Sequence, residues 1–388
     1  MAILNAFLMK LLRDFSGCCD IRLFNRFKRL IEVTIFEKKA KSSLHDMVKF
    51  DFIRKKSFAI DLGNTNTLVR DVDKLLVDQP SYIVLDSNRA AVKAVGAQAY
   101  RMFEKSHQAF RPIKPMKGGV VADYDSAAKM IRALMHQAYS EKSVLNGYGD
   151  IISGVPYSTT HVERRALLNV LETLHAKNVY LLYEPLAAAL GMGLNIQEPD
   201  GKMVIDIGGG ITEVVVISLS GIVCFQSIKV AGDSMDESIR HYFRKEYNMA
   251  IGIKTAEQVK IAVGAVLGNL ENPPAPMAVK GKEILRGLPI TRTADHKEIA
   301  CVLEKSMSAI ELGIIQTLEI CPPELASDIY GNGIYVTGGN ALLRGLKERL
   351  ERKLKVPVHI DTYPLLSVSK GVATVLREPK KYKGVLMH

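Results

Sequence analysis

The sequence predicts an α/β protein built from two similar halves, and two observations support this fold class. The first is a motif that occurs twice, as S-F-A-I-D-L-G-N-T-N-T at 57–67 and as K-M-V-I-D-I-G-G-G-I-T at 202–212. Each copy has the pattern of an apolar strand, an Asp, a glycine-containing turn and a Thr that opens a second strand. The second observation is the alternation of strand and helix patterns after each copy, which is typical of a three-layer α/β architecture.

The two turns have the composition of phosphate-binding hairpins. Backbone N–H groups and hydroxyls at such a tip can donate hydrogen bonds to a phosphate. The Asp at the strand end can hold a hydrated Mg2+, which is bound through few carboxylates. One copy alone would be a weak signal, because an Asp can also simply cap a turn. Two copies predict two domains that face each other with a nucleoside triphosphate and Mg2+ between them.

The composition is that of an ordinary globular protein with room for at least two domains. The chain has 388 residues, of which 47% are hydrophobic and 24% charged. Its five cysteines form no C-x-x-C pair and no Cys/His cluster, so we expect reduced thiols in a cytosolic protein. We expect no secretory signal and no transmembrane segment, because no apolar run reaches the roughly 18 residues that a span requires.

The first 56 residues differ from the rest in charge. They hold 13 Lys and Arg against 6 Asp and Glu, a balance of +7, which leaves 11 − 7 = +4 for the remainder. This distribution indicates a basic arm on a nearly neutral body and argues against a nucleic-acid partner. Apolar residues such as Leu4, Phe7, Leu8 and Leu11 recur in the arm at helical spacing beside cationic residues, which predicts a helix at a membrane surface. Two alternatives are a helix docked on protein, or translation that begins at Met47.

Strands and helices after the arm follow from periodicity and from capping residues. We expect strands near 58–62, 66–70, 75–78, 82–85, 150–155 and 179–183. Helices are expected near 125–140 and near 160–175, the latter with Thr159 or Thr160 as its N-cap. A Pro-started helix follows Glu184. After the second motif we expect helices near 233–247, 255–268, 297–320 and 340–354.

Three further motifs follow predicted strands. They are Glu184-Pro185, Ala231-Gly232-Asp233 and the run V-T-G-G-N-A at 336–341. Glycines at such points let the backbone approach a flat ligand closely, and the start of a helix favours negative charge. Together with the repeated hairpin, these motifs strengthen the prediction of a nucleotide site.

With these motifs, residues 58 to about 376 resemble the actin, sugar kinase and heat-shock chaperone ATPase superfamily, and within it the MreB family of bacterial actins. The stretches R-P-I-K-P-M-K-G-G-V-V-A-D-Y, G-V-P-Y-S-T-T-H-V-E-R-R-A, A-G-D-S-M-D-E-S-I, P-P-E-L-A-S-D-I and T-G-G-N-A-L-L-R-G-L carry the resemblance. It implies an actin-like ATPase fold, with two duplicated RNase H-like domains around a nucleotide cleft. Domain I would span 57–194 with a C-terminal helix at about 364–377, and domain II 195–363, between the leader 1–56 and a tail 378–388.

The resemblance also implies roles for individual residues. Asp61 and Asp206 would hold the metal, and Glu184 would polarise the attacking water, with Thr212 as the second catalytic residue. The nucleotide-binding residues would be Gly63, Asn64, Thr65, Asn66, Gly208, Gly209, Gly210, Gly232, Asp233, Glu257, Lys260, Gly338, Gly339 and Asn340. Among these, Glu257 and Lys260 would contact ribose and adenine. From the residues alone, Glu184 could instead favour the start of a helix, and Glu257 with Lys260 could be an exposed helix pair.

The chain departs from the family pattern at three places. Ile211 stands where relatives have a Thr whose hydroxyl lies near the catalytic water, so we expect slow hydrolysis. Asn340 replaces a third glycine, and the first hairpin reads G-N-T-N-T where G-T-A-N-T is usual. Binding of ATP and Mg2+ should survive, because it depends mostly on the aspartates and on backbone groups.

The resemblance implies a cytoskeletal function. ATP would favour filaments of this chain at the cytoplasmic face of the inner membrane, where they would guide the cell-wall elongation machinery and determine cell shape. Val144 and Leu145 occupy the place of a hydrophobic loop that relatives use for membrane contact. The alternative is an ATP-binding scaffold that does not hydrolyse productively, which Ile211 favours. A sugar or acetate kinase is disfavoured, because no second constellation for an acceptor hydroxyl is present.

Overall fold

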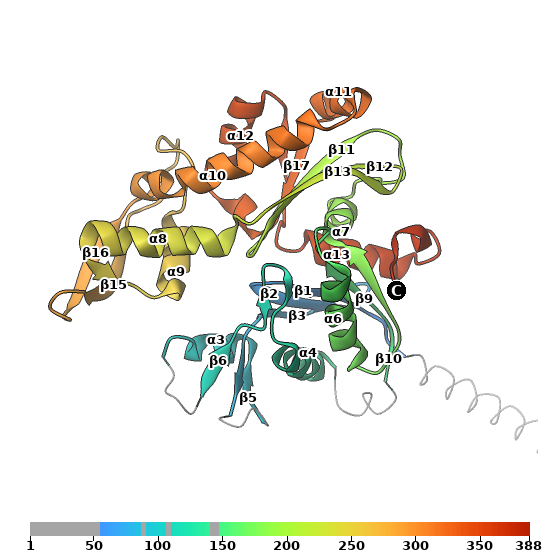
Figure 1. Cartoon of the computed structure of the whole chain (residues 1–388), viewed down its shortest axis with the longest axis horizontal. Coiled ribbons are helices and arrows are strands. Elements are labelled where there is room, and N and C mark those ends of the chain that lie inside the picture. Colours follow the sequence, from blue (N-terminus) through green and yellow to red (C-terminus); the bar gives the residue numbers. More distant parts are fainter. Residues whose placement is uncertain (1–54, 87–90, 106–109, 140–146) are drawn as a thin grey trace, which may run out of the picture. The chain divides into compact units, whose positions relative to one another are not determined.

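The computed structural model describes residues 55–86, 91–105, 110–139 and 147–388 (Figure 1). The chain divides into two units, Met1–Arg54 and Lys55–His388, and the second contains all the described residues. The predicted leader helices, Met47 and the Val144-Leu145 pair therefore lie outside the described residues. Within the ranges given, no helix has both the length and the apolar character that crossing a bilayer requires.

The first half is built on a five-stranded sheet with the strand order β10-β9-β1-β2-β3. In this sheet β1, β2 and β3 are antiparallel neighbours. On the other side of β1, β9 pairs with it in parallel and β10 pairs in parallel with β9. The strands are β1 (Phe58–Leu62), β2 (Asn66–Arg70), β3 (Leu75–Pro80), β9 (Tyr148–Val155) and β10 (Ala176–Tyr183). We call the part of the molecule built on this sheet the first lobe.

The second half is built on a sheet with the equivalent order, β13-β12-β11-β17-β18. Here β11, β12 and β13 are antiparallel neighbours. On the other side of β11, β17 pairs with it in parallel and β18 pairs in parallel with β17. The strands are β11 (Lys202–Ile207), β12 (Thr212–Ser218), β13 (Gly221–Ile228), β17 (Ile334–Thr337) and β18 (Val358–Ile360). We call this part the second lobe. The shared topology is the structural counterpart of the repeated motif.

The two hairpins also agree in register. Thr67 is the cross-strand partner of Leu62 in the first hairpin, and Thr212 is the partner of Ile207 in the second. Asp61 and Asp206 each stand one residue before that last pair. The duplicated sequence therefore places two equivalent carboxylates at the ends of two equivalent strands.

Helices cover both faces of each sheet. In Figure 1, α7 and α13 lie between the two sheets, and their apolar residues form one core cluster with residues of both sheets. A Cβ on Gly191 of α7 or on Gly371 of α13 would collide with the backbone of the other helix, so these glycines permit the close crossing. The bounds are α7 (Glu184–Gly191) and α13 (Ser367–Arg377).

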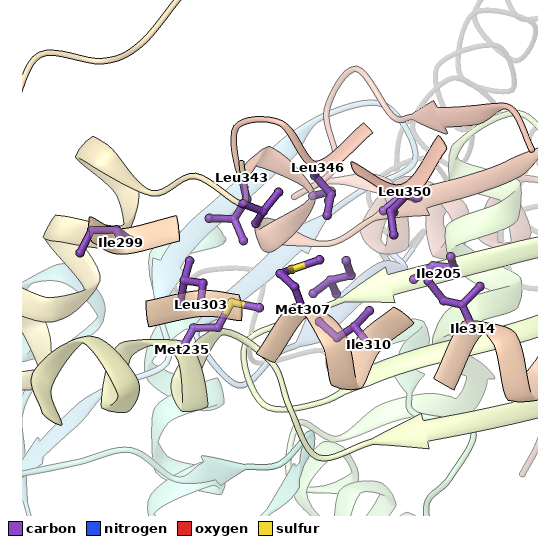
Figure 2. Packing of buried hydrophobic residues seen from close by; sticks show 14 of the residues in the cluster. Ile205, Met235, Ile299, Leu303, Met307, Ile310, Ile314, Leu343, Leu346 and Leu350 are labelled. Atoms are coloured by element: carbon purple, nitrogen blue, oxygen red, sulfur yellow. The ribbon is translucent and has the colours of Figure 1, made fainter. Parts of the chain in front are cut away.

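The opposite faces carry the remaining large helices. The first sheet packs against α4 (Tyr124–Ala138) and α6 (His161–Glu172). The second packs against α8 (Gly232–Tyr247), α9 (Ile253–Val263), α10 (His296–Glu319), α11 (Pro323–Asn332) and α12 (Leu346–Leu354). Figure 2 shows the core of the second lobe, where Leu303, Met307 and Ile310 of α10 lie close to Leu343, Leu346 and Leu350. This apolar layer fixes the orientation of the helices that border the cleft described below.

Smaller elements extend each lobe. In the first, β4 (Ile83–Leu85), β5 (Val92–Val95) and β6 (Arg111–Ile113) form a sheet beside α3 (Gly96–Met102), and β7 (Met116–Lys117) pairs with β8 (Val120–Val121). In the second, β14 (Met249–Ala250), β15 (Met277–Glu283) and β16 (Pro289–Ala294) form a further sheet. Two short 3-10 helices are η1 (Gly339–Leu342) and η2 (Lys383–Val385).

Most predicted elements are confirmed, including the strands at 58–62 and 66–70 and the Thr160 cap, which forms a capping box with Glu163. Two helix predictions were wrong in extent. The helix expected near 340–354 is a 3-10 turn followed by α12, since Gly345 adopts a φ of 80° that interrupts a helix. The helix expected near 255–268 ends at Val263, because the following segment pairs with Arg344 instead.

Candidate nucleotide site

A cavity of about 890 Å3 is lined by residues of both lobes. Its walls come from the two hairpin turns, the start of α7, the start of α8, one face of α9 and the turn after β17. Of the predicted site residues, those that line it are Asp61, Gly63, Asn64, Thr65, Asn66, Glu184, Asp206, Gly208, Gly209, Gly210, Gly232, Asp233, Glu257, Lys260, Gly338, Gly339 and Asn340. Thr212 does not line the cavity.

The two hairpin turns approach each other so closely that side chains cannot be accommodated at two glycines. A Cβ on Gly209 would collide with the hydroxyl of Thr65 in the opposite turn. A Cβ on Gly210 would lie 2.9 Å from Cα of Gly118 and 3.0 Å from Cγ of Asn64. The turns therefore present backbone groups from both lobes to one small volume, which suits an anion such as a phosphate chain.

Four of the carboxylates that line the cavity interact electrostatically with one another, and we call this group the carboxylate floor: Asp61, Glu184, Asp206 and Glu213. Burial raises the pKa of Asp61 to about 7. Burial, with the nearby charges of Glu213 and Asp61, raises the pKa of Asp206 to about 7. Burial and the other three carboxylates raise the pKa of Glu184 well above its usual value. This concentration of negative charge disfavours ionisation of the whole group.

The carboxylate floor fits a hydrated divalent cation. Within the described ranges, no three acidic, His or Cys side chains converge closely enough to hold a metal directly. Mg2+ needs no such cage, because it keeps most of its waters and binds one or two carboxylates together with phosphate oxygens. Asp61 and Asp206, at equivalent strand ends, have the chemistry of such ligands. A cation there would also relieve the repulsion among the four carboxylates.

Glu213 is the most deeply buried of the four, with 3% exposure. Its carboxylate accepts hydrogen bonds from the backbone N–H groups of Tyr157 (3.1 Å) and Ser158 (3.0 Å) in the first lobe. Burial raises the pKa of Glu213, while these hydrogen bonds oppose that change. The residue therefore joins the second hairpin to the turn that follows β9.

The lobes also meet at the start of α8. Asp233 accepts hydrogen bonds from Nδ2 of Asn64 (2.6 Å) and from Nζ of Lys114 (2.9 and 3.0 Å). The backbone N–H of Asp233 donates to the carbonyl of Gly209, 2.7 Å away. The Oδ1 atom of Asn64 is buried and has no hydrogen-bond partner in the structure. A ligand that carries a hydrogen-bond donor or a hydrated cation would satisfy it.

The second-lobe wall is held by two polar residues. Lys260 forms an ion pair with Asp236 (2.9 Å) and donates to the carbonyl of Gly232 (3.0 Å). Asn340 donates from Nδ2 to the carbonyl of Gly208 (2.6 Å). The amide at 340 thus supports the second hairpin, a contact that a glycine at this position could not make.

Of the two residues predicted to be catalytic, one lines the cavity and the other does not. Glu184 lines the cavity at the start of α7. Thr212 is fully buried, and its hydroxyl donates to the carbonyl of Val230 at 2.7 Å, so its hydroxyl is engaged away from the cleft. Ile211 does line the cavity, and its Cδ1 would lie 3.4 Å from a Cβ on Gly119. An apolar side chain therefore lines the site at this position.

Several cavity residues were missed by the sequence reasoning: Tyr82, Tyr100, Lys114, Glu213, Asp236 and Lys254. Glu213 left a signal, because a carboxylate at the start of the apolar strand T-E-V-V-V is unusual. No sequence spacing could have indicated Lys114 or Tyr100, since only the tertiary fold brings them to the second lobe.

Comparison with known proteins agrees with this geometry. A family model described as MreB/Mbl protein matches residues 55–384. The cell shape-determining protein Mbl of Bacillus subtilis is 37% identical over 322 residues, 83% of this chain and 96% of that protein. The cell shape-determining protein MreB of Escherichia coli K12 is 37% identical over 328 residues, 83% of this chain and 94% of that protein.

Solved structures show the same similarity. The crystal structure of MreB5 of Spiroplasma citri bound to AMPPNP has a TM-score of 0.80 and 35% identity, with 85% of this chain and 98% of that chain covered. The ADP-bound form of that protein gives a TM-score of 0.79. The MamK double helical filament, at 18% identity and a TM-score of 0.67, shares the fold. The actin-like α/β fold predicted from the sequence is confirmed, and the chain belongs to the MreB/Mbl family.

Proposed function

We propose that this chain is an actin-like cytoskeletal protein of cell shape that binds ATP with Mg2+ between its lobes. The observation that carries the proposal is the cavity where two glycine hairpins from equivalent sheets meet above four carboxylates. Relatives of this chain are named cell shape-determining proteins, and a structural neighbour was crystallised with AMPPNP and with ADP. The phosphates would lie between the turns 63–66 and 208–210.

We assign the following roles to residues of the chain. Asp61 and Asp206 would hold the hydrated Mg2+, which when bound neutralises charge on the phosphates. Glu184, which lines the cavity at the start of α7, would polarise the attacking water. Glu257 and Lys260 would contact the ribose and adenine, and the backbone at 338–340 would pass beneath the base. Thr212 would act by supporting the second hairpin through Val230.

The site supports a switch between two states. The triphosphate would touch both hairpins, and loss of its terminal phosphate would remove one set of contacts between the lobes. We propose that the ATP state favours filaments of this chain, because the shared fold of a known filament is compatible with such assembly. The domain limits 57–194 with 364–377, and 195–363, remain our proposal for the bodies that move.

We further propose that filaments lie at the inner face of the cell membrane and guide the cell-wall elongation machinery. The basic arm 1–56 supports a membrane contact through its +7 balance of charge. Deletion of residues 1–46 should weaken sedimentation with anionic vesicles and leave nucleotide affinity unchanged. Equal sedimentation of the shortened protein would exclude this role for the arm.

A second candidate is an ATP-binding scaffold that does not hydrolyse productively. Ile211 favours it, because an apolar side chain lines the cavity at a position where a hydroxyl could hold water. Both candidates predict nucleotide binding, so phosphate release separates them.

Electron microscopy of the full-length protein on a lipid monolayer tests the main proposal. With ATP and Mg2+ we expect filaments, and with the Asp206→Ala variant we expect none. Asp78→Ala is the matched control, since Asp78 lines the same cavity but is an exposed carboxylate of β3. Absence of polymers with every nucleotide, together with normal ATP binding, would favour the scaffold.

A further inference from the structure

The start of α9 lacks a capping group in its own sequence. Its N-cap is Gly252, which has no side chain, and no acidic residue follows in the first turn. A helix N-terminus leaves several backbone N–H groups unsatisfied, and a side chain normally accepts from them. The N-terminal part of α9 also borders the nucleotide cavity, through Ile253 and Lys254 in the first turn and Glu257 just after it.

The missing cap comes from the first lobe. The carboxylate of Glu104, two residues after α3, accepts from the backbone N–H of Ile253 at 2.7 Å and from that of Lys254 at 3.4 Å. Its side chain fills the space where a Cβ of Gly252 would be. The glycine at the N-cap is thus what admits a carboxylate from the other lobe.

Glu104 adopts an uncommon backbone conformation to reach this position. Its φ is 63°, in the left-handed region that non-glycine residues seldom occupy. Such a conformation is retained only where surrounding contacts favour it, and it is concentrated at functional sites. The contact with α9 is the compensation that the structure shows.

Tyr100 of α3 adds three contacts to the N-terminal part of α9. Its hydroxyl donates to Glu257 (2.5 Å), its backbone carbonyl accepts from Nζ of Lys254 (3.3 Å), and that ammonium lies 4.1 Å from its ring centroid. Burial, followed by the contact with Glu257, raises the pKa of Tyr100, so the phenol stays protonated and remains a donor. Tyr82 packs on Tyr100 at 5.2 Å and on Phe103 at 5.0 Å, which holds this part of the first lobe rigid.

From these contacts we propose that Tyr100 and Glu104 are positioning residues of the nucleotide site, which fix α9 and Glu257 from the opposite lobe and thereby set the rate of nucleotide release. The proposal rests on the proposed function. Glu257 cannot rotate freely toward or away from a nucleoside while Tyr100 holds it. The lobes cannot separate at this edge unless Glu104 leaves the N–H groups of α9. Opening of the cleft and release of the nucleotide therefore both require this contact to break.

Dissociation of a fluorescent ADP, labelled with a methylanthraniloyl group and chased with excess ATP, tests this in the full-length protein. Glu104→Ala and Tyr100→Phe should each accelerate dissociation about fivefold, the effect of losing a cap or one hydrogen bond to a charged group. Glu104→Gln retains an acceptor oxygen and should restore most of the slow release. Glu237→Ala is the matched control, because Glu237 lines the same cavity but pairs with Arg240 of its own helix.

A second measurement separates this inference from the proposed function. In nucleotide-free protein, the amides of Ile253 and Lys254 should exchange with solvent faster in Glu104→Ala than in the unaltered chain. If no labelled nucleotide binds to the unaltered protein, the proposed function fails. The exchange experiment needs no nucleotide, so it still tests whether Glu104 caps α9. Unchanged amide exchange in Glu104→Ala overturns the inference, as does unchanged dissociation in both Glu104→Ala and Tyr100→Phe. Tyr100→Phe removes a single oxygen atom, so it tests the idea even where Glu104→Ala impairs folding.

Discussion

Asn64 and Asp233, 169 positions apart in the chain, are joined by a 2.6 Å hydrogen bond across the cavity. The first belongs to the glycine hairpin of the first lobe and the second to the first turn of α8 in the second lobe. Lys114 binds the same carboxylate. This triad closes the cleft at the place where we propose that the phosphates bind, so its charge should matter for the ligand.

Lys114→Ala should lower the affinity for ATP. Without the lysine, the carboxylate of Asp233 faces the phosphates uncompensated, and we expect a loss of about tenfold, as for other charged hydrogen bonds. Isothermal titration calorimetry with ATP and ADP measures it. Lys117→Ala is the control, since Lys117 lines the cavity but is more exposed. An equal effect of both substitutions would mean that only the overall charge matters.

Glu184→Gln should separate binding from hydrolysis. The amide keeps the shape of the side chain but cannot accept a proton from water, so we expect phosphate release to fall by about a hundredfold. ATP affinity should stay within about twofold, since the residue binds water and not the nucleotide in our proposal. Single-turnover assays measure the rate. Normal turnover in this variant would remove Glu184 from the mechanism.

Ile211→Thr should accelerate phosphate release. The substitution replaces an apolar group that lines the cavity with a hydroxyl that can hold a water molecule. The matched control is Ile261→Thr, because Ile261 lines the same cavity from α9 and is 69% exposed. A large increase with Ile211→Thr alone would favour the scaffold for the natural chain. No increase would show that the apolar side chain of Ile211 does not limit hydrolysis.

Asp236→Asn should change how stability depends on pH. Burial raises the pKa of Asp236 to about 7, against the effect of Lys260. A carboxyl whose pKa is higher in the folded state binds a proton more tightly there, so folding is disfavoured as pH rises from about 4 through 7. The amide cannot ionise. The melting temperature of the variant minus that of the unaltered protein should therefore increase between about pH 5.5 and pH 8.

The control for this experiment is Asp125→Asn, which alters an exposed carboxylate on α4 that pairs with Lys129. Its difference in melting temperature should vary little over the same range. A pH-independent difference for Asp236→Asn would contradict the assigned cause. Nucleotide and divalent cation are left out of both samples, since either would stabilise the folded state by mass action.

The sequence by itself determined the duplicated fold and most of the residues that line the candidate site. Asp61 with Gly63 and Asp206 with Gly208 could be recognised because a strand, an Asp and a tight turn are local features, set by neighbours in the chain. The same holds for Glu184-Pro185 at the start of α7. Repetition of the motif then implied two equivalent sheets, and the strand order confirmed it.

Only the tertiary structure decided which side chains from distant segments complete the cleft. Thr212 is the last residue of the repeated motif, but as the first residue of β12 it is buried and donates to Val230, while Ile211 before it lines the cavity. Lys114, Tyr100 and Glu104 meet the second lobe through contacts with α8 and α9 that no local pattern encodes. Helix caps are usually local as well, yet α9 takes its cap from Glu104 because Gly252 provides none of its own.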